Sequence, residues 1–272
     1  MTNFSDRIQL RKRHKKILKL IPLRNEPPFP PNWLRLEVNH RFQVLNHILH
    51  FPIDEKILEI GCGDHGITSM AIAGFLGSQG KLISIDIARL REVHNFKQVS
   101  PKIEVVQCDA LHLPFSKVFD KTITFDGTRS FRSPENLIRI FRILLEWVNE
   151  TIIIATLPIA ETSGQKLHLD LFRIREELFD ALWGTKDDLF YFTEGELTDF
   201  LKLAGADEIK TSIVSVQAPH FLGYLPICYF ERIKDSSIRR KLTRRFQKLW
   251  KETQHIKEEH PPCIILQASK EK

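Results

Sequence analysis

The fold of this chain is decided by one short stretch, Leu58-Glu59-Ile60-Gly61-Cys62-Gly63-Asp64-His65-Gly66. An apolar run ends in it and is followed by three closely spaced glycines. Glycine lets a backbone turn sharply and lets a ligand approach without a Cβ in the way. The stretch therefore predicts a strand that leads into a loop for a nucleoside cofactor. The same spacing satisfies the GxGxxG of nicotinamide-binding domains, and by itself that pattern is a weak indication.

Outward from this loop, short apolar runs alternate with segments of helical periodicity. Such alternation is typical of parallel strands that are buried on both faces and joined by crossover helices. We expect strands at 56–61, 81–86, 103–107, 118–125 and 151–157, helices at 68–76, 88–99 and 134–147, and later β-rich segments at 208–217 and 263–269. The pattern predicts an α/β fold with a doubly wound sheet.

Acidic residues follow the next two predicted strands at their ends. Asp86 lies twenty residues beyond Gly66, where its carboxylate can accept two hydrogen bonds from ribose hydroxyls. Asp109 follows the third strand, where its carboxylate can accept a hydrogen bond from an adenine amino group while the Ala110 N–H meets a ring nitrogen. Either aspartate could instead be a helix N-cap, because Asp is favoured just before a helix.

Four segments of the chain match a known family. They are ILEIGCG (57–63), GKLISIDI (80–87), CDALHLPF (108–115) and FDKTITFD (119–126). They resemble the class I S-adenosylmethionine-dependent methyltransferases, and within them the group similar to ubiquinone- and menaquinone-biosynthesis enzymes and other small-molecule methyltransferases. The resemblance covers about 56–217. It implies a seven-stranded, mostly parallel sheet whose last strand, 263–269, is inserted antiparallel, and it implies S-adenosylmethionine as the cofactor.

The resemblance also implies which residues bind this cofactor. They are Glu59, Gly61, Gly63, Asp86, Ile87, Asp109, Ala110 and Asp126. The first three would form the loop at the methionine end, Asp86 would hold the ribose, and Ile87 would pack on adenine. Asp109 and Ala110 would read the adenine edge. Asp126 would lie near the methionine moiety or on the methyl-acceptor side.

The chain departs from the family pattern at two places. Two residues, Asp64 and His65, precede the third glycine where the family usually has one, a departure that concerns the loop geometry and not the identity of the cofactor. After the fourth strand, Phe125-Asp126-Gly127-Thr128 replaces an Asn-Pro-Pro-Tyr or Asp-Pro-Pro-Tyr run. Methylation of adenine N6 or of glutamine is therefore not expected.

The net charge of +6 is unevenly distributed, and the basic segments lie in two appendages. Segment 1–24 carries a net charge of +7 and segment 234–258 a net charge of +6, so the rest of the chain is acidic. Such segments either contact nucleic acid or an anionic membrane, or are simply solvated helical faces. We expect 1–50 to form a helical, proline-containing extension of a methyltransferase domain at 51–272.

A second appendage precedes the last strand, and we expect a helical lid there at 218–261. Its first part, 220–233, is apolar and aromatic and could line a hydrophobic acceptor pocket. Its second part has the pattern of a basic amphipathic helix. The apolar positions of that helix are Ile238, Leu242, Phe246, Leu249 and Trp250.

Methyl transfer from a sulfonium requires mainly orientation and exclusion of water, because the donor is already activated. A hydroxyl acceptor would still need a general base. The candidates in regions that should cover the site are His168, Asp170, Tyr191, His220 and Tyr224. A lone histidine is more often structural than catalytic, so no catalytic residue is assigned.

The sequence thus favours a methyltransferase for a small-molecule or lipid-like acceptor. An RNA methyltransferase that uses the basic helices, a non-catalytic S-adenosylmethionine-binding partner protein and a nicotinamide-dependent oxidoreductase are the alternatives. The four cysteines lack CxxC spacing, which argues against a metal site and a disulfide framework and favours the cytoplasm. We expect no transmembrane segment, because no apolar run approaches the roughly 20 residues of a membrane span.

Overall fold

The computed structural model describes residues 4–24, 30–63, 65–87, 99–114, 119–131, 133–156, 163–184, 192–216, 227–253 and 263–270. Its strands are β1 (Lys56–Ile60), β2 (Lys81–Asp86), β3 (Ile103–Gln107), β4 (Phe119–Phe125), β5 (Val148–Thr156), β6 (Glu208–Val214) and β7 (Cys263–Ser269). Its α-helices are α1 (Phe4–Leu20), α2 (Trp33–Leu45), α3 (Ile67–Ala73), α5 (Pro134–Trp147), α6 (Ser163–Trp183), α7 (Glu194–Ala204), α8 (Ile227–Glu231) and α9 (Ser236–Thr253).

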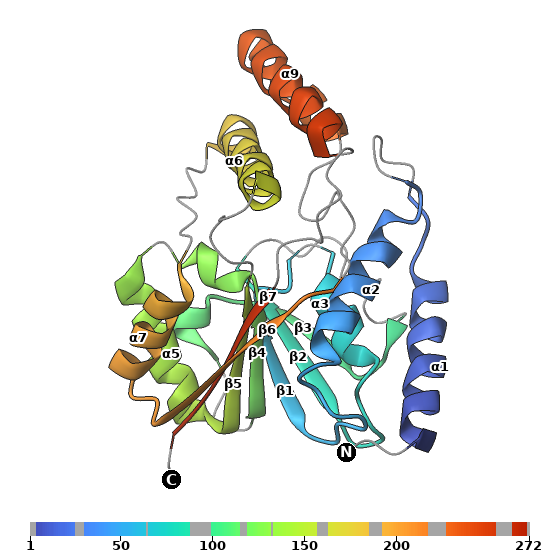
Figure 1. Ribbon diagram of the computed structural model, residues 1–272, viewed down its shortest axis with the longest axis vertical. Coiled ribbons are helices and arrows are strands. Elements are labelled where there is room, and N and C mark those ends of the chain that lie inside the picture. The colour runs from blue at the N-terminus through green and yellow to red at the C-terminus, as the bar shows by residue number, and fades with distance from the viewer. Residues whose placement is uncertain are drawn as a thin grey trace.

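The strands form a single seven-stranded sheet in the order β3-β2-β1-β4-β5-β7-β6 (Figure 1). The pairs among β1 to β5 are parallel, and β7 runs antiparallel between β5 and β6. The predicted α/β sheet with an antiparallel last strand is therefore confirmed. β5 begins three residues earlier than expected, because Val148 leaves α5 directly in extended conformation.

Helices cover both faces of the sheet, and each face has its own core (Figure 1). On one face α5 buries Leu137, Phe141 and Leu144, and α7 adds Leu197 and Leu201. On the other face α3 packs against β2, and α2 packs against α3. The predicted helix at 134–147 is confirmed, whereas 88–98 of the predicted helix at 88–99 lies outside the described residues.

The N-terminal extension shares the core of the sheet. In α1 the side chains of Leu10 and Ile17 are buried, and in α2 those of Val38 and Phe42 are buried in the same apolar cluster as β1. The His14 ring stacks on the Phe42 ring, with 3.6 Å between their centroids. These contacts hold α1 against α2.

Three further helices, α6, α8 and α9, lie beyond the carboxyl ends of the parallel strands, and we call them the cap helices (Figure 1). Leu242 and Phe246 of α9 are buried, and the Phe246 ring contacts Phe230 of α8. This confirms the amphipathic helix, except that Ile238 in its first turn is 43% exposed. Helix α6, which packs along α9, was not predicted. None of the described helices is both long and apolar enough to cross a bilayer.

Candidate functional site

The loop after β1 turns through three glycines in left-handed conformation. The φ angles of Gly61, Gly63 and Gly66 are 77°, 64° and 54°. A Cβ on Gly61 would lie 3.3 Å from the Cα of Gly127, so the loop after β1 passes directly against the loop after β4. The Gly61 N–H donates to the Ile85 carbonyl at 2.9 Å, which ties the loop to the end of β2.

Asp86, at the end of β2, lies in direct contact with this loop. Its Oδ2 accepts a hydrogen bond of 2.8 Å from the Gly63 N–H. Its backbone carbonyl accepts from the Cys108 N–H at 3.0 Å, which ties in the end of β3. Next to it, the Ile87 side chain is 67% exposed. The structure thus brings the predicted loop, carboxylate and apolar side chain together.

Asp109 begins a short 3-10 helix, Ala110–His112. Its Oδ1 accepts from the Leu111 N–H at 2.9 Å, and its Oδ2 lies 3.0 Å from His112 Nδ1. The hydrogen bond from Leu111, followed by that from His112, lowers the pKa of the Asp109 carboxyl. The N-cap interpretation is confirmed, and contacts of Asp109 and of the buried Ala110 with adenine stay predictions.

Glu59 lies beneath the loop, inside the protein. Its side chain is 1% exposed, and its carboxylate accepts hydrogen bonds from Ser69 of α3 and from Ser84 of β2, the latter at 2.6 Å. Burial raises the pKa of Glu59 to about 7, against the opposing effect of the two serines. Glu59 therefore joins β1, β2 and α3 beneath the loop, and a direct contact with a cofactor stays a prediction.

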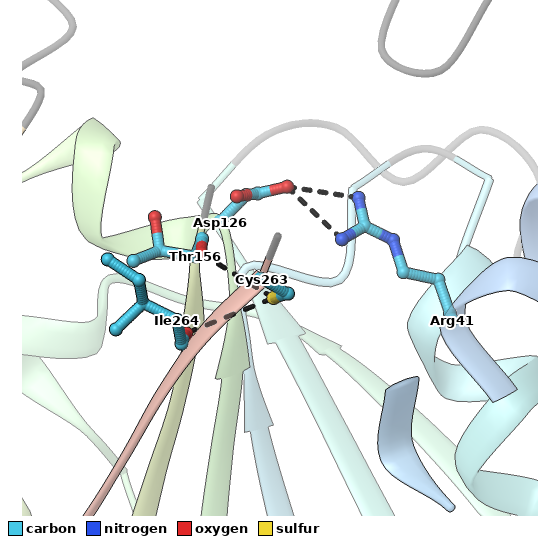
Figure 2. A network of polar contacts seen from close by, with 5 residues as sticks. All are labelled: Arg41, Asp126, Thr156, Cys263 and Ile264. Carbon is cyan, nitrogen blue, oxygen red and sulfur yellow. Dashed lines mark hydrogen bonds and ion pairs between the residues drawn. The ribbon is translucent and has the colours of Figure 1, made fainter. Parts of the chain in front are cut away.

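Asp126 forms the other side of the site, where β4 ends. Its φ of 59° is left-handed, the only such angle among the described non-glycine residues, and its N–H donates to the Ala155 carbonyl at 2.8 Å. A non-glycine residue in this conformation costs about 1–3 kcal/mol and marks functional positions more often than others. The ends of β5 and β7 lie beside it, where Cys263 Sγ is 3.5 Å from the Thr156 carbonyl (Figure 2).

Arg41 of α2 reaches this position from the N-terminal extension, and the sequence interpretation missed it. Both terminal nitrogens donate to Asp126 Oδ2 at 3.1 Å (Figure 2), and the guanidinium lies 3.6 Å from the centre of the Phe125 ring. The side chains of Arg41 and Asp126 are only 12% and 17% exposed. The Arg41 Nε is buried and finds no hydrogen-bond partner among the described residues. Helix 33–45 also carries Arg35, Glu37 and His40, so no signal in the sequence singled out Arg41.

The candidate bases contribute little to this geometry. Asp170 lies on α6 and pairs with Arg173 at 3.2 Å. The side chain of His168 and all of Tyr191, His220 and Tyr224 lie outside the described part of the chain. Within that part, no three His, Cys, Asp or Glu side chains gather as metal ligands would.

Solved structures share the fold of this chain. The protein is similar to a cyclopropane-fatty-acyl-phospholipid synthase-like protein from Lactobacillus casei, with a TM-score of 0.67 and 17% identity over 95% of this chain and 99% of that one. A phosphoethanolamine N-methyltransferase from Haemonchus contortus, in complex with S-adenosylhomocysteine, matches at TM-score 0.52 and 15% identity over 86% and 53% of the two chains.

A third similar structure is magnesium protoporphyrin IX methyltransferase from Synechocystis with bound S-adenosylhomocysteine, at TM-score 0.50 and 15% identity over 96% and 94% of the two chains. No family model matches the chain, and no curated protein matches it significantly. At these identities the likeness shows the fold, which is that of the class I S-adenosylmethionine-dependent methyltransferases.

Proposed function

We propose that this protein is an S-adenosylmethionine-dependent methyltransferase that acts on a small-molecule or lipid-like acceptor. The observation that carries the proposal is the antiparallel β7 between β5 and β6, in a sheet whose β1 and β2 end in the loop and carboxylate of a nucleoside site. A nicotinamide-binding domain instead has six parallel strands in the order 3-2-1-4-5-6. The strand order therefore favours the methyl donor over NAD.

The adenosine part of the cofactor fits the ends of β2 and β3. Asp86 would accept hydrogen bonds from the ribose hydroxyls, and the exposed Ile87 would pack on the adenine ring. Asp109 and Ala110 would lie at the adenine edge. Gly61 passes against Gly127, whereas the space where a Gly63 Cβ would lie is open to 4 Å, which supports a backbone contact with the ligand at Gly63.

The amino-acid end of the cofactor fits the far side of the loop. It carries one carboxylate and one ammonium group, and Arg41 and Asp126 supply one complementary charge each. Both charged side chains are largely buried, so their interactions with a ligand are screened less by solvent than at an open surface. We assign the carboxylate to Arg41 and the ammonium group to Asp126.

When bound, S-adenosylmethionine supplies a methyl group that its sulfonium charge has already activated. The protein orients the acceptor against it and excludes water. The cap helices lie over this edge of the sheet, which suits the second task (Figure 1). The segment 220–226 of the expected apolar lid lies outside the described residues, and Phe230 and Ile233 are buried within the core.

A lipid-like acceptor is supported by a similar structure named as a fatty-acyl-phospholipid synthase-like protein, and a small-molecule acceptor by the phosphoethanolamine N-methyltransferase. No observation favours RNA as the acceptor. We place the protein in the cytoplasm, which the spacing of its four cysteines favours.

Transfer of a labelled methyl group tests the proposal. The purified protein is incubated with methyl-labelled S-adenosylmethionine and with a lipid extract, a small-metabolite extract or total RNA. Label in the lipid or small-metabolite fraction, lost in Asp86→Ala, is the expected result. Label in RNA alone would contradict the proposed acceptor class, and cofactor binding without transfer to any fraction would indicate a non-catalytic binding protein.

A further inference from the structure

The outward side of α1 is strongly basic. Between residues 4 and 24 the exposed cations are Arg7, Arg11, Lys12, Lys15, Lys16 and Lys19. The single acidic residue of this segment is Asp6. The helix runs along the flank of the molecule beside α2 (Figure 1), so these cations line one side of the protein.

Large apolar side chains are exposed in the same segment. Phe4 is 80% exposed, Ile8 40%, Leu20 45% and Leu23 59%. They make up half of the eight large apolar side chains that are exposed in the described part of the chain. Single exposed apolar residues are ordinary on a protein surface, whereas Phe4 and Ile8 lie one turn apart on the same helix and form one apolar patch.

Two exposed apolar residues and three cations of α1 lie on one stripe. Residues three or four positions apart share a helix face, and this spacing connects Phe4, Ile8, Lys12, Lys15 and Lys19. The opposite face is already used, because Leu10, His14 and Ile17 are buried against the rest of the protein. Phe4 and Ile8 therefore cannot turn inward without displacing this core.

We propose that the outward face of α1 docks the protein on the surface of an anionic lipid bilayer. The cations would meet the phosphate groups of the lipids, and Phe4 and Ile8 would enter the boundary between headgroups and acyl chains. RNA offers phosphates as well but has no apolar phase to receive Phe4 and Ile8. The exposure of these two side chains therefore favours a lipid surface over RNA. This inference concerns binding alone and does not depend on methyl transfer.

Helix α9 provides the matched comparison. Its exposed face is also basic, with Arg239, Arg240, Lys241, Arg244, Lys248 and Lys251. Its apolar residues Leu242 and Phe246 are buried on the neighbouring cap helices, and Ile238 is its only large exposed apolar side chain. It therefore has the charge of α1 without the apolar stripe.

Sedimentation with lipid vesicles tests the inference on the full chain, without cofactor. The probes are vesicles of phosphatidylcholine alone and vesicles of equal parts phosphatidylcholine and phosphatidylglycerol. We expect binding to the anionic vesicles only, weakened by salt. Lys12→Gln/Lys15→Gln/Lys19→Gln should lower the partition coefficient by about two orders of magnitude. Phe4→Ser/Ile8→Ser should lower it about tenfold at unchanged charge.

The control is Arg240→Gln/Arg244→Gln/Lys248→Gln, which removes the same charge from α9 and should leave vesicle binding within about twofold. All substituted side chains are exposed or at the surface, and the Tm of each variant checks that it folds. The inference is overturned if the wild-type protein does not bind anionic vesicles, or if the α9 control variant loses as much binding as the α1 triple variant. It is also overturned if poly(U) RNA competes for α1 while Phe4→Ser/Ile8→Ser has no effect.

Discussion

Arg41 and Asp126 lie 85 residues apart in the sequence, yet both terminal nitrogens of the arginine donate to one carboxylate oxygen, each at 3.1 Å. The pair joins α2 of the N-terminal extension to the end of β4, above the Phe125 ring. It therefore couples the extension to the proposed cofactor site, and it should contribute both to stability and to binding.

Arg41→Met should destabilise the protein by about 2 kcal/mol, because a largely buried Asp126 carboxylate would lose its partner. Asp126→Asn should lower the free energy of unfolding less in the Arg41→Met protein than in the wild type. The difference, which is the coupling energy of a double-mutant cycle, should be about 1 kcal/mol. Urea unfolding of the four proteins measures this energy. A coupling energy near zero would show that the pair does not hold α2 against β4.

Gly61→Ala should destabilise the protein by about 2 kcal/mol and reduce cofactor affinity. The left-handed φ of 77° alone costs about 1 kcal/mol for alanine, and the new Cβ would meet the Gly127 Cα at 3.3 Å. Gly184→Ala is the control, since its φ is 66° but a Cβ there would meet nothing within 4 Å. Urea unfolding should show a smaller loss of stability for Gly184→Ala than for Gly61→Ala, and Gly184→Ala should leave the cofactor affinity unchanged. Equal losses would argue against close passage of the two loops.

Glu59 should make stability depend on pH. Burial raises the folded-state pKa of this acid from 4.5 to about 7, so between these two values the unfolded chain ionises while the folded protein keeps the proton. The wild type should therefore lose about 3 kcal/mol relative to Glu59→Gln as the pH rises from about 4.5 to about 7, with no further change above. Urea unfolding across this range measures the difference, and parallel pH profiles of the two proteins would refute the raised pKa.

The cap helices should depend on Phe246, which is 2% exposed between Phe230 and Trp250. Phe246→Ala should lower the free energy of unfolding by about 3–5 kcal/mol, because it leaves a cavity between these side chains. Ile238→Ala on the same helix should cost less than about 0.5 kcal/mol, because that side chain is 43% exposed. Thermal unfolding compares the two. Similar shifts in Tm would mean that α9 is not packed as described.

The sheet could be predicted from the sequence because its strands are apolar runs with sharp ends. The grouping of Gly63 with Asp86 followed from the rule that carboxyl ends of parallel strands meet at one edge. The partner of Arg41 could not be predicted, because Arg41 meets Asp126 only through the tertiary fold. Helix α6 was missed although Leu171, Ile174 and Leu178 recur at the spacing of three and four that is typical of a helix. Only its packing alongside α9, which begins more than 50 residues later, depends on the tertiary fold.

Local chemistry explains the remaining differences. Asp109 is a helix N-cap, an alternative that its position before a short helix already allowed. In β1, Leu58 and Ile60 are buried on one face of the sheet, and Glu59 shares the other face with the buried Ile57. Because that face is covered as well, the Glu59 side chain had to enter the core with hydrogen-bond partners. The resemblance assigned Glu59 to the loop, and the structure places its side chain beneath it.

Calorimetric titration with S-adenosylmethionine and, separately, with NAD tests the cofactor assignment most directly. We expect one-to-one binding of S-adenosylmethionine, no heat with NAD, and a loss of affinity of at least about tenfold in Asp86→Ala. Asp86→Asn, which keeps an acceptor for the Gly63 N–H, separates the ribose contact from support of the loop. Binding of NAD, or S-adenosylmethionine binding that Asp86→Ala leaves unchanged, would contradict the proposed site.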